Sequence, residues 1–198
     1  MRAFTDARTS ATVDELWLVE HPPVYTMGLK GRNGTATEIH GIPVVYSDRG
    51  GDITYHGPGQ VVLYALIDIV RLGIDIKRLV QSLEQAVIED LAARGITAQR
   101  LSGAPGVYVE QRKIASLGLR VRRGCSYHGL AYNVDMDLDA FTHIDPCGYQ
   151  GMQVTQLTKL LQPEAVVALS DTGVGLAQRF AGLLGYNRPV ISPSRDYA

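Results

Sequence analysis

Apolar and polar residues along the chain form strand-length runs and two helical repeats. Val61–Ile69 is an almost wholly apolar run rich in valine and isoleucine, which is typical of a central, buried strand. Apolar residues recur at helical spacing over 75–94, and Gly95 stands where a helix-ending glycine belongs. A second helical repeat covers 171–184. Shorter strands are predicted at 15–20, 43–47, 52–56, 96–99, 106–110, 113–121 and 127–134.

This order of elements predicts the fold class. Strands come early and in the middle of the chain, with helices between and after them, so we expect an α/β (α+β) fold with a mixed β-sheet flanked by helices. Residues 28–41 carry glycines among polar residues and are predicted to form a loop. We find no internal repeat, low-complexity tract or linker, and therefore expect residues 1–198 to form one domain.

Composition narrows the range of functions. Hydrophobic residues make up 45% and charged residues 20%, which is ordinary for a soluble globular protein. A formal net charge of −1 argues against a nucleic-acid partner. No apolar run is long enough to span a bilayer, and the N-terminus lacks the apolar stretch of a signal peptide. Two cysteines make no disulfide framework. These features predict a reduced, cytoplasmic protein with no membrane partner.

One glycine-rich stretch, Arg49–Gln60, is the first candidate site. Glycine in an extended segment marks a bulge or a place where a ligand approaches the backbone closely. The paired glycines after Arg49 therefore predict a site. His56 within this stretch, and His128 further on, could each be a proton donor or a hydrogen-bond anchor; a purely structural histidine is the alternative for both.

Lys113 is a candidate for proton transfer. If 113–121 is a regular strand, Lys113 shares its face only with apolar residues, namely Ala115, Leu117, Leu119 and Val121. Burial favours the neutral amine of a lysine, the form that can accept a proton. The alternative is that Lys113 begins the strand and extends its ammonium group to water.

Cys147 is the candidate nucleophile. It lies between a proline and a glycine in a tight loop, which can present a thiol with little steric cover. A thiol needs a nearby base or cation, and Lys113 would supply the cation if the fold brings the two residues together. Cys125 begins a predicted strand and is interpreted as a small packing residue.

The sequence gives little support for a nucleotide-cofactor site or a metal site. No glycine-rich segment precedes a helix in a nucleotide-binding pattern, so we expect no cofactor. Cys125-x-x-His128 is a weak zinc signal, and we expect no metal. Arg120, Arg122 and Arg123 form a local basic cluster, which is either a docking patch for an acidic partner or a solvated strand end.

The chain resembles the lipoyl(octanoyl) transferases, also called the lipoate-protein ligase B family. The matching segments are Glu20–Thr26, Arg49–Gln60, Ala104–Val109, Lys113–Gly118, His128–Asn133 and Pro146–Gly148. They cover most of the chain in order. Members of the family begin with a further strand ahead of the position of Met1, so this chain is expected to lack an N-terminal edge strand.

The resemblance implies the biotin and lipoate ligase fold and a cytosolic acyltransferase. The donor would be octanoyl-acyl carrier protein. The acceptors would be lysines on the lipoyl domains of 2-oxoacid dehydrogenases and on the glycine cleavage H protein. Cys147 would be the acyl-thioester nucleophile, and Lys113 would lower its pKa and shuttle protons. The substrate pocket would be lined by Arg49, Gly50, Gly51, Asp52, Ile53, Thr54, Tyr55, His56, Ser116, Leu117, Gly118, Gly129, Leu130 and Ala131.

This reaction would need no ATP. Backbone N–H groups near Cys147 and near Gly50 and Gly51 would stabilise the oxyanion. Two alternatives remain open: an ATP-dependent ligase of the same fold that forms an acyl-adenylate, and a non-catalytic module that binds an acyl group or its carrier protein.

Overall fold

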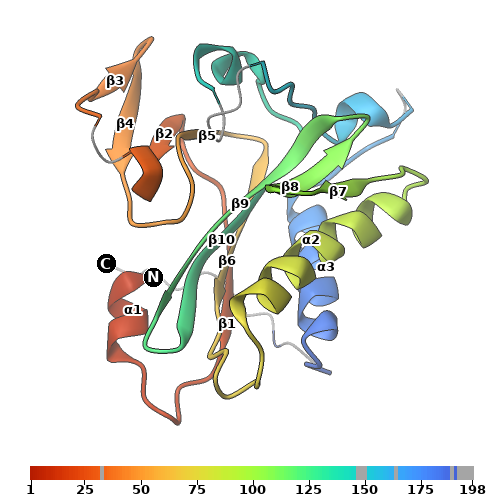
Figure 1. Ribbon diagram of the computed structural model, residues 1–198. Coiled ribbons are helices and arrows are strands. Elements are labelled where there is room, and N and C mark those ends of the chain that lie inside the picture. Colours follow the sequence, from red (N-terminus) through yellow and green to blue (C-terminus); the bar gives the residue numbers. More distant parts are fainter. Residues whose placement is uncertain (32–33, 146–150, 163–164, 188–189, 191–198) are drawn as a thin grey trace.

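The computed structural model describes residues 1–31, 34–145, 151–162, 165–187 and 190 (Figure 1). Its elements, in chain order, are α1 (Arg2–Ala7), β1 (Glu15–Val19), β2 (Val24–Met27), η1 (Leu29–Gly31), β3 (Glu38–Ile39), β4 (Ile42–Tyr46), β5 (Thr54–His56), β6 (Gln60–Leu66), α2 (Ile76–Ala92), β7 (Gln99–Leu101), β8 (Ala104–Val109), β9 (Arg112–Arg122), β10 (Cys125–Asn133), η2 (Asp139–His143), η4 (Thr158–Leu160) and α3 (Leu169–Leu183).

Two sheets organise these strands. The larger has six strands in the order β1-β6-β10-β9-β8-β7, and its neighbouring strands pair antiparallel. The smaller has four strands in the order β3-β4-β2-β5, and β2 runs parallel to β4. Figure 1 shows α2 and α3 side by side against the larger sheet, while the smaller sheet stands at its other side.

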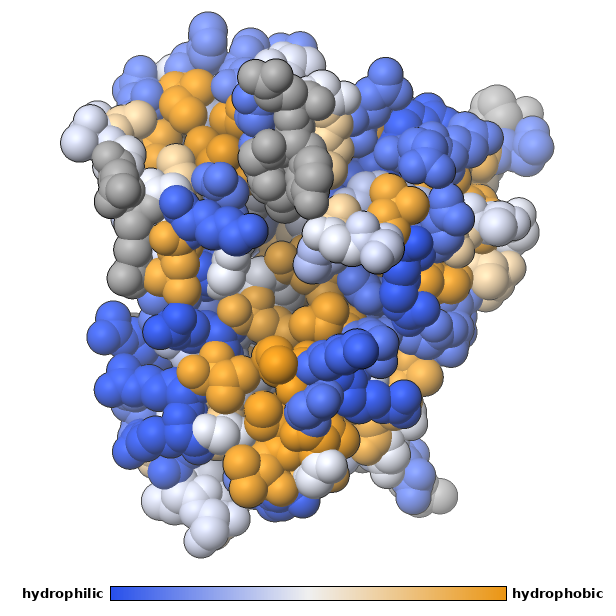
Figure 2. Space-filling model, viewed as in Figure 1, coloured by the Kyte–Doolittle hydropathy of each residue, from blue (hydrophilic) through white to orange (hydrophobic). Residues whose placement is uncertain are grey.

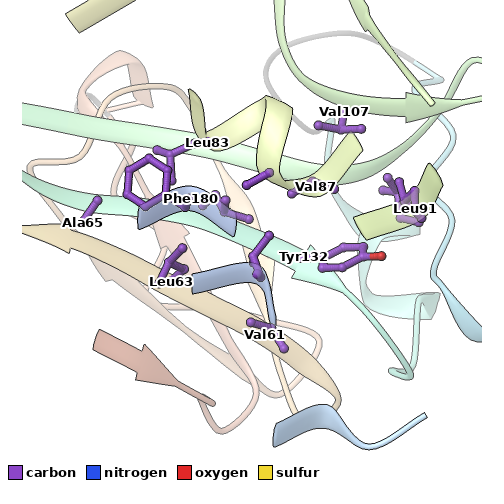
Figure 3. Close-up of a cluster of buried hydrophobic side chains, with 14 of the residues drawn as sticks. Val61, Leu63, Ala65, Leu83, Val87, Leu91, Val107, Tyr132 and Phe180 are labelled. Carbon is purple, nitrogen blue, oxygen red and sulfur yellow. The ribbon is translucent and has the colours of Figure 1, made fainter. Parts of the chain in front are cut away.

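The main core lies between the larger sheet and the two long helices. Alternate residues of β6 share a face, so Val61, Leu63 and Ala65 all point toward the helices. They meet Leu83 of α2 and Phe180 of α3, as Figure 3 shows. Each fully buried side chain of this size contributes about 1.5–3 kcal/mol relative to its exposed state. Packing of the helical apolar faces therefore fixes the sheet that carries the candidate site.

A second, smaller core joins the smaller sheet to the chain that follows β10. Tyr25 of β2 and Tyr55 of β5 are tilted toward each other, with ring centroids 5.5 Å apart. Phe141 of η2 meets the Tyr55 ring edge-on at 5.6 Å. The Tyr25 hydroxyl donates a 2.7 Å hydrogen bond to the carbonyl of Ala140. The segment just before the predicted nucleophile is thus anchored on the smaller sheet.

The central strand and the two helices are confirmed within a few residues. Asp75 caps α2 by accepting a 2.7 Å hydrogen bond from the Arg78 N–H, and Gly95 takes a left-handed φ of 77° just after the helix. The strand predicted at 96–99 is largely wrong, because the Ile96 N–H bonds back to the Leu91 carbonyl and closes the helix. Strand pairing begins only at Gln99.

No helix within the described ranges is both long and apolar enough to cross a membrane.

Candidate active site

Residues 47–53, between β4 and β5, form a loop that we call the Arg49 loop. Its glycines allow two chain segments to pack closely. The Gly50 N–H donates a 3.0 Å hydrogen bond to the Leu119 carbonyl of β9. A Cβ at Gly50 would lie 2.9 Å from that oxygen, and a Cβ at Gly28 would lie 2.4 Å from the Gly51 oxygen. The close approach predicted from these glycines is therefore an approach of the protein to itself. It also engages the Gly50 N–H, which was one of the donors predicted for the oxyanion.

Charged and polar groups hold the same loop from both sides. The Arg49 guanidinium donates a 3.0 Å hydrogen bond to the Thr26 hydroxyl of β2. The Asp48 carboxylate accepts hydrogen bonds from the Tyr127 hydroxyl and, at 2.9 Å, from His128 Nε2. Burial alone would raise the pKa of Asp48, but these hydrogen bonds outweigh it and lower the pKa. The loop therefore bridges β2 and β10.

His128 has an unusual backbone conformation at this contact. Its φ is 61°, in the left-handed region that non-glycine residues rarely adopt. The next residue, Gly129, packs so close to β6 that a Cβ would lie 1.9 Å from the Leu63 oxygen. Such conformations cost about 1–3 kcal/mol and cluster at functional sites. The distortion directs His128 to Asp48.

His56 uses both ring nitrogens as a hydrogen-bond anchor. Nδ1 lies 2.8 Å from Gln60 Oε1, and Nε2 lies 3.2 Å from the Thr26 hydroxyl. Burial lowers the pKa of His56 to about 4, so the ring is neutral near pH 7. This geometry fits the anchoring interpretation of His56 rather than that of a proton donor.

The predicted walls from β9 and β10 divide between the two faces of the larger sheet. Gly118 pairs with Gly129, while Leu117 pairs with Leu130. Leu130 is 2% exposed in the helix-side core, and Leu117 packs against that core. Ser116, paired with Ala131, lies with the glycines on the opposite face. Only the backbone of the two leucines is available to a pocket on that face.

Lys113 is buried, as predicted, but on the other face from the one that regular alternation gives. It is 1% exposed, so its ammonium does not extend to water as the alternative supposed. Val107 pairs with Ala115 and Tyr108 with Lys113, which leaves Ile114 as an extra residue. The predicted face shared with Ala115 is therefore wrong, because this bulge turns Lys113 to the face of Tyr108.

A glycine of β8 makes room for the lysine side chain. A Cβ at Gly106 would lie 2.9 Å from Lys113 Cε, and the lysine Nζ lies 5.3 Å from the centre of the Tyr108 ring. That distance is within the range of a cation–π contact. Gly106 and Tyr108 thus determine the space in which the Lys113 side chain lies. The sequence spacing did not predict either contact, because both depend on the bulge at Ile114 that turns Lys113 to their face.

Cys147 lies outside the described residues, but the chain on each side of it is placed. Upstream, His143 stacks on His40 with ring centroids 4.1 Å apart. Downstream, the Lys113 N–H donates to the Gln153 carbonyl and the Thr155 N–H donates to the Lys113 carbonyl, both at 2.9 Å. The chain that carries Cys147 therefore leaves from the smaller sheet and returns to Lys113 itself.

The structure also places Cys125 and the basic cluster of Arg120, Arg122 and Arg123. Cys125 is buried at 8% exposure, and burial raises its pKa, so it is the packing residue predicted for it. The basic cluster is partly occupied within the chain. Arg122 lies 3.2 Å from the Asp6 carboxylate and Arg123 donates to the Asp6 carbonyl, so both hold α1. This contact supports a structural role over a docking patch.

Among the residues that the structure places, no group of three histidine, cysteine or acidic side chains is arranged to hold a metal ion.

An apolar groove runs beside the start of α2, lined by Ile69, Ile76, Leu119 and Val121. Figure 2 shows hydrophobic surface gathered over this part of the molecule. It lies toward the far end of β9 from Lys113.

The fold is that of the lipoate ligases. A solved structure described as an archaeal lipoylation system, a bipartite lipoate protein ligase from Thermoplasma acidophilum, superposes with a TM-score of 0.71 at 16% identity, covering 96% of this chain and 80% of that chain. The model of the lipoyl protein ligase A/B catalytic domain matches residues 1–172. The chain belongs to that family.

Its curated relatives carry a more specific name. An octanoyltransferase of Thiobacillus denitrificans is 60% identical over 160 residues, covering 81% of this chain and 73% of the relative. An octanoyltransferase of Shewanella sp. (strain W3-18-1) is 52% identical over 190 residues, covering 96% and 86% respectively.

Proposed function

We propose that this protein is an octanoyltransferase that transfers an octanoyl group from octanoyl-acyl carrier protein to a specific lysine of lipoyl domains, the first step of endogenous protein lipoylation. The acyltransferase class rests on family membership and on the relatives named octanoyltransferase. An octanoyl donor and lipoyl-domain acceptors follow from that class. The carrier protein as donor and a covalent route through Cys147 are the proposal's own additions.

One observation carries the covalent route. The segment that follows the Cys147 loop is hydrogen-bonded on both sides of the Lys113 peptide, at 2.9 Å each. Lys113 is also buried at 1% exposure in a position that Gly106 keeps open. A thiol nucleophile needs a nearby base or cation, and Lys113 is the buried lysine to which the chain that carries Cys147 returns. We assign Cys147 as nucleophile and Lys113 as its proton partner.

The proposed reaction has two acyl-transfer steps. The Cys147 thiolate attacks the thioester carbonyl of the donor. The bond from that carbonyl to the pantetheine sulfur breaks, and the leaving thiolate takes a proton from the Lys113 ammonium. The acceptor lysine amine then attacks the new thioester, the bond to Cys147 breaks, and Lys113 takes the proton released by the amine. Atoms and charges balance without ATP.

We assign the acyl chain to the sheet face that carries Gly118, Gly129 and Ala131, opposite the helices. The Arg49 loop covers that face at Gly118, where a Cβ would lie 2.9 Å from the Gly50 oxygen, and the acyl chain would lie beside this loop. The acceptors would be the lipoyl domains of 2-oxoacid dehydrogenases and the glycine cleavage H protein, and the site of action the cytoplasm.

A direct experiment tests the donor and the nucleophile. The Cys125→Ala protein is incubated with octanoyl-acyl carrier protein in the absence of ATP, and intact mass and peptide mapping locate any octanoyl adduct. We expect one octanoyl group on Cys147, which disappears when a lipoyl domain is added and the domain gains it. An intact mass without an adduct would contradict the covalent route.

An ATP-dependent ligase is the second candidate, because the fold is shared with a lipoate-protein ligase A structure bound with ATP, at a TM-score of 0.71 and 17% identity. The Cys147→Ala variant separates the two. Octanoyl transfer at the full rate in this variant, dependent on ATP and free octanoate, would favour the ligase. Loss of transfer with a retained fold would favour the thioester.

A further inference from the structure

A continuous line of hydrogen bonds connects the Arg49 loop to Lys113. It runs through side chains of the smaller sheet and then crosses the larger one. The contacts, in order, are Arg49 Nε to Thr26 Oγ1 at 3.0 Å, Thr26 Oγ1 to His56 Nε2 at 3.2 Å, His56 Nδ1 to Gln60 Oε1 at 2.8 Å, Gln60 Nε2 to Asn133 Oδ1 at 2.9 Å, Asn133 Nδ2 to the Thr155 carbonyl at 3.0 Å, and the Thr155 N–H to the Lys113 carbonyl at 2.9 Å.

The line has one direction. The Gln60 nitrogen also donates to the Tyr55 carbonyl, which can only accept, so the Gln60 oxygen faces His56. The proton of the neutral imidazole therefore sits on Nδ1 and is donated to Gln60, and Nε2 accepts from the Thr26 hydroxyl. The amide of Gln60 donates to Asn133, whose amide donates in turn. Each of the two amides accepts through its oxygen and donates through its nitrogen along the line, so reversing one bond would break the next.

The middle of the line is deeply buried. Gln60 is 1% exposed and Asn133 4% exposed. A buried amide without a partner costs about 1–3 kcal/mol, so each of the two depends on the other. Gln60 stands at the end of the glycine-rich stretch and Asn133 at the end of β10. The line therefore joins the Arg49 loop to the backbone of Lys113 across the sheet.

We propose that Gln60 and Asn133 are positioning residues for acyl transfer. They hold the segment 153–155, and with it the Lys113 peptide and the chain that carries Cys147, at a fixed place relative to the Arg49 loop. This inference rests on the proposed function. It assigns a role to two residues outside the predicted pocket, neither of which touches the reacting atoms.

The test replaces amide donors by isosteric acceptors. Asn133→Asp places a carboxylate oxygen against the Thr155 carbonyl, and Gln60→Glu does the same against Asn133 Oδ1. Gln156→Glu is the matched control, because Gln156 is also buried and also joined to its neighbours through both ends of its amide. Its oxygen accepts from the Met136 N–H and its nitrogen donates to the Thr158 hydroxyl, whose own proton goes to Asp135 at 3.0 Å, so Gln156→Glu buries a carboxylate among hydrogen-bonded groups without breaking the line.

Two measurements are made in the Cys125→Ala background: the rate of octanoyl adduct formation, and the pH profile of Cys147 alkylation by iodoacetamide. We expect Asn133→Asp and Gln60→Glu to slow adduct formation by up to about 100-fold, the size of a small misplacement of catalytic groups. The alkylation profile should shift to higher pH while the KM for the donor changes little. A role in stability alone would lower the melting temperature without moving this profile.

If these variants unfold, the double variant Gln60→Met with Asn133→Leu removes both partners of the central bond without burying a charge; it leaves His56 Nδ1 and the Thr155 carbonyl unpaired at about 1–3 kcal/mol each, less than a buried carboxylate costs. It should fold and show the same kinetic losses. Rates and profiles equal to those of Gln156→Glu would overturn the positioning role. Absence of an adduct on Cys147 in the parent protein would instead overturn the proposed function, so the two failures are distinguishable.

Discussion

At the scale of single residues, the position of the Lys113 side chain depends on the space left by Gly106 of the neighbouring strand β8. Gly106→Ala would place a Cβ 2.9 Å from Lys113 Cε and 2.7 Å from the Ala115 oxygen. Gly103→Ala is a matched control, because Gly103 also has a positive φ, but a Cβ added there would meet no atom within 4 Å. We expect both to lose about 1–2 kcal/mol of stability from backbone strain, and only Gly106→Ala to lose acyl transfer beyond that. Urea unfolding and adduct kinetics measure the two effects.

The Lys113→Met substitution separates charge from packing at the same place. Methionine keeps most of the buried stem and removes the ammonium together with its contact to the Tyr108 ring, a contact worth about 0.5–2 kcal/mol. The free energy of unfolding should therefore fall by at least that order. Alkylation of Cys147 at neutral pH should slow and its pH profile move upward, because the cation that favours the thiolate is gone. An unchanged pH profile would contradict the proposal that Lys113 favours the Cys147 thiolate.

At the scale of elements, two glycines give opposite expectations. Gly175 lies within α3 with open space around its Cβ position, so Gly175→Ala should stabilise the protein by about 0.5–1 kcal/mol. Gly129→Ala should destabilise it by about 1–3 kcal/mol or more, because its Cβ would meet the Leu63 oxygen at 1.9 Å and push β10 from β6. Chemical denaturation of both variants tests this reading of the sheet.

The sequence predicted some elements of the fold and missed others. Strong periodicity placed β6 and both long helices, because burial on a helical face or in a central strand leaves a repeated pattern. The Ile114 bulge left no such pattern, so strand alternation put Lys113 on the wrong face. The line through Gln60 and Asn133 was missed for another reason: its partners are distant in sequence, and a buried amide resembles any other polar residue. Its only signal was the position of Gln60 directly after Gly-Pro-Gly.

At the scale of the whole molecule, buried neutral histidines make stability depend on pH. Burial lowers the pKa of His21, His56 and His128, that of His56 from 6.5 to about 4. Between these values the unfolded chain binds protons that the folded chain does not, so stability falls as pH falls from about 6.5 to 4. Over this window His56 contributes up to about 1.4 kcal/mol per pH unit, and His21 and His128 act in the same direction. His56→Asn, which keeps a donor toward Gln60, should flatten this fall when unfolding is measured across the window.

The central claim is that a thiol outside the described residues receives the acyl group beside Lys113. The most direct measurement is peptide-level mass spectrometry of the Cys125→Ala protein after incubation with octanoyl-acyl carrier protein without ATP. The account predicts one octanoyl group on the peptide that contains Cys147, and none in the Cys147→Ala variant. Full octanoyl transfer to a lipoyl domain by that variant, with no acyl-enzyme detected in the parent, would contradict it.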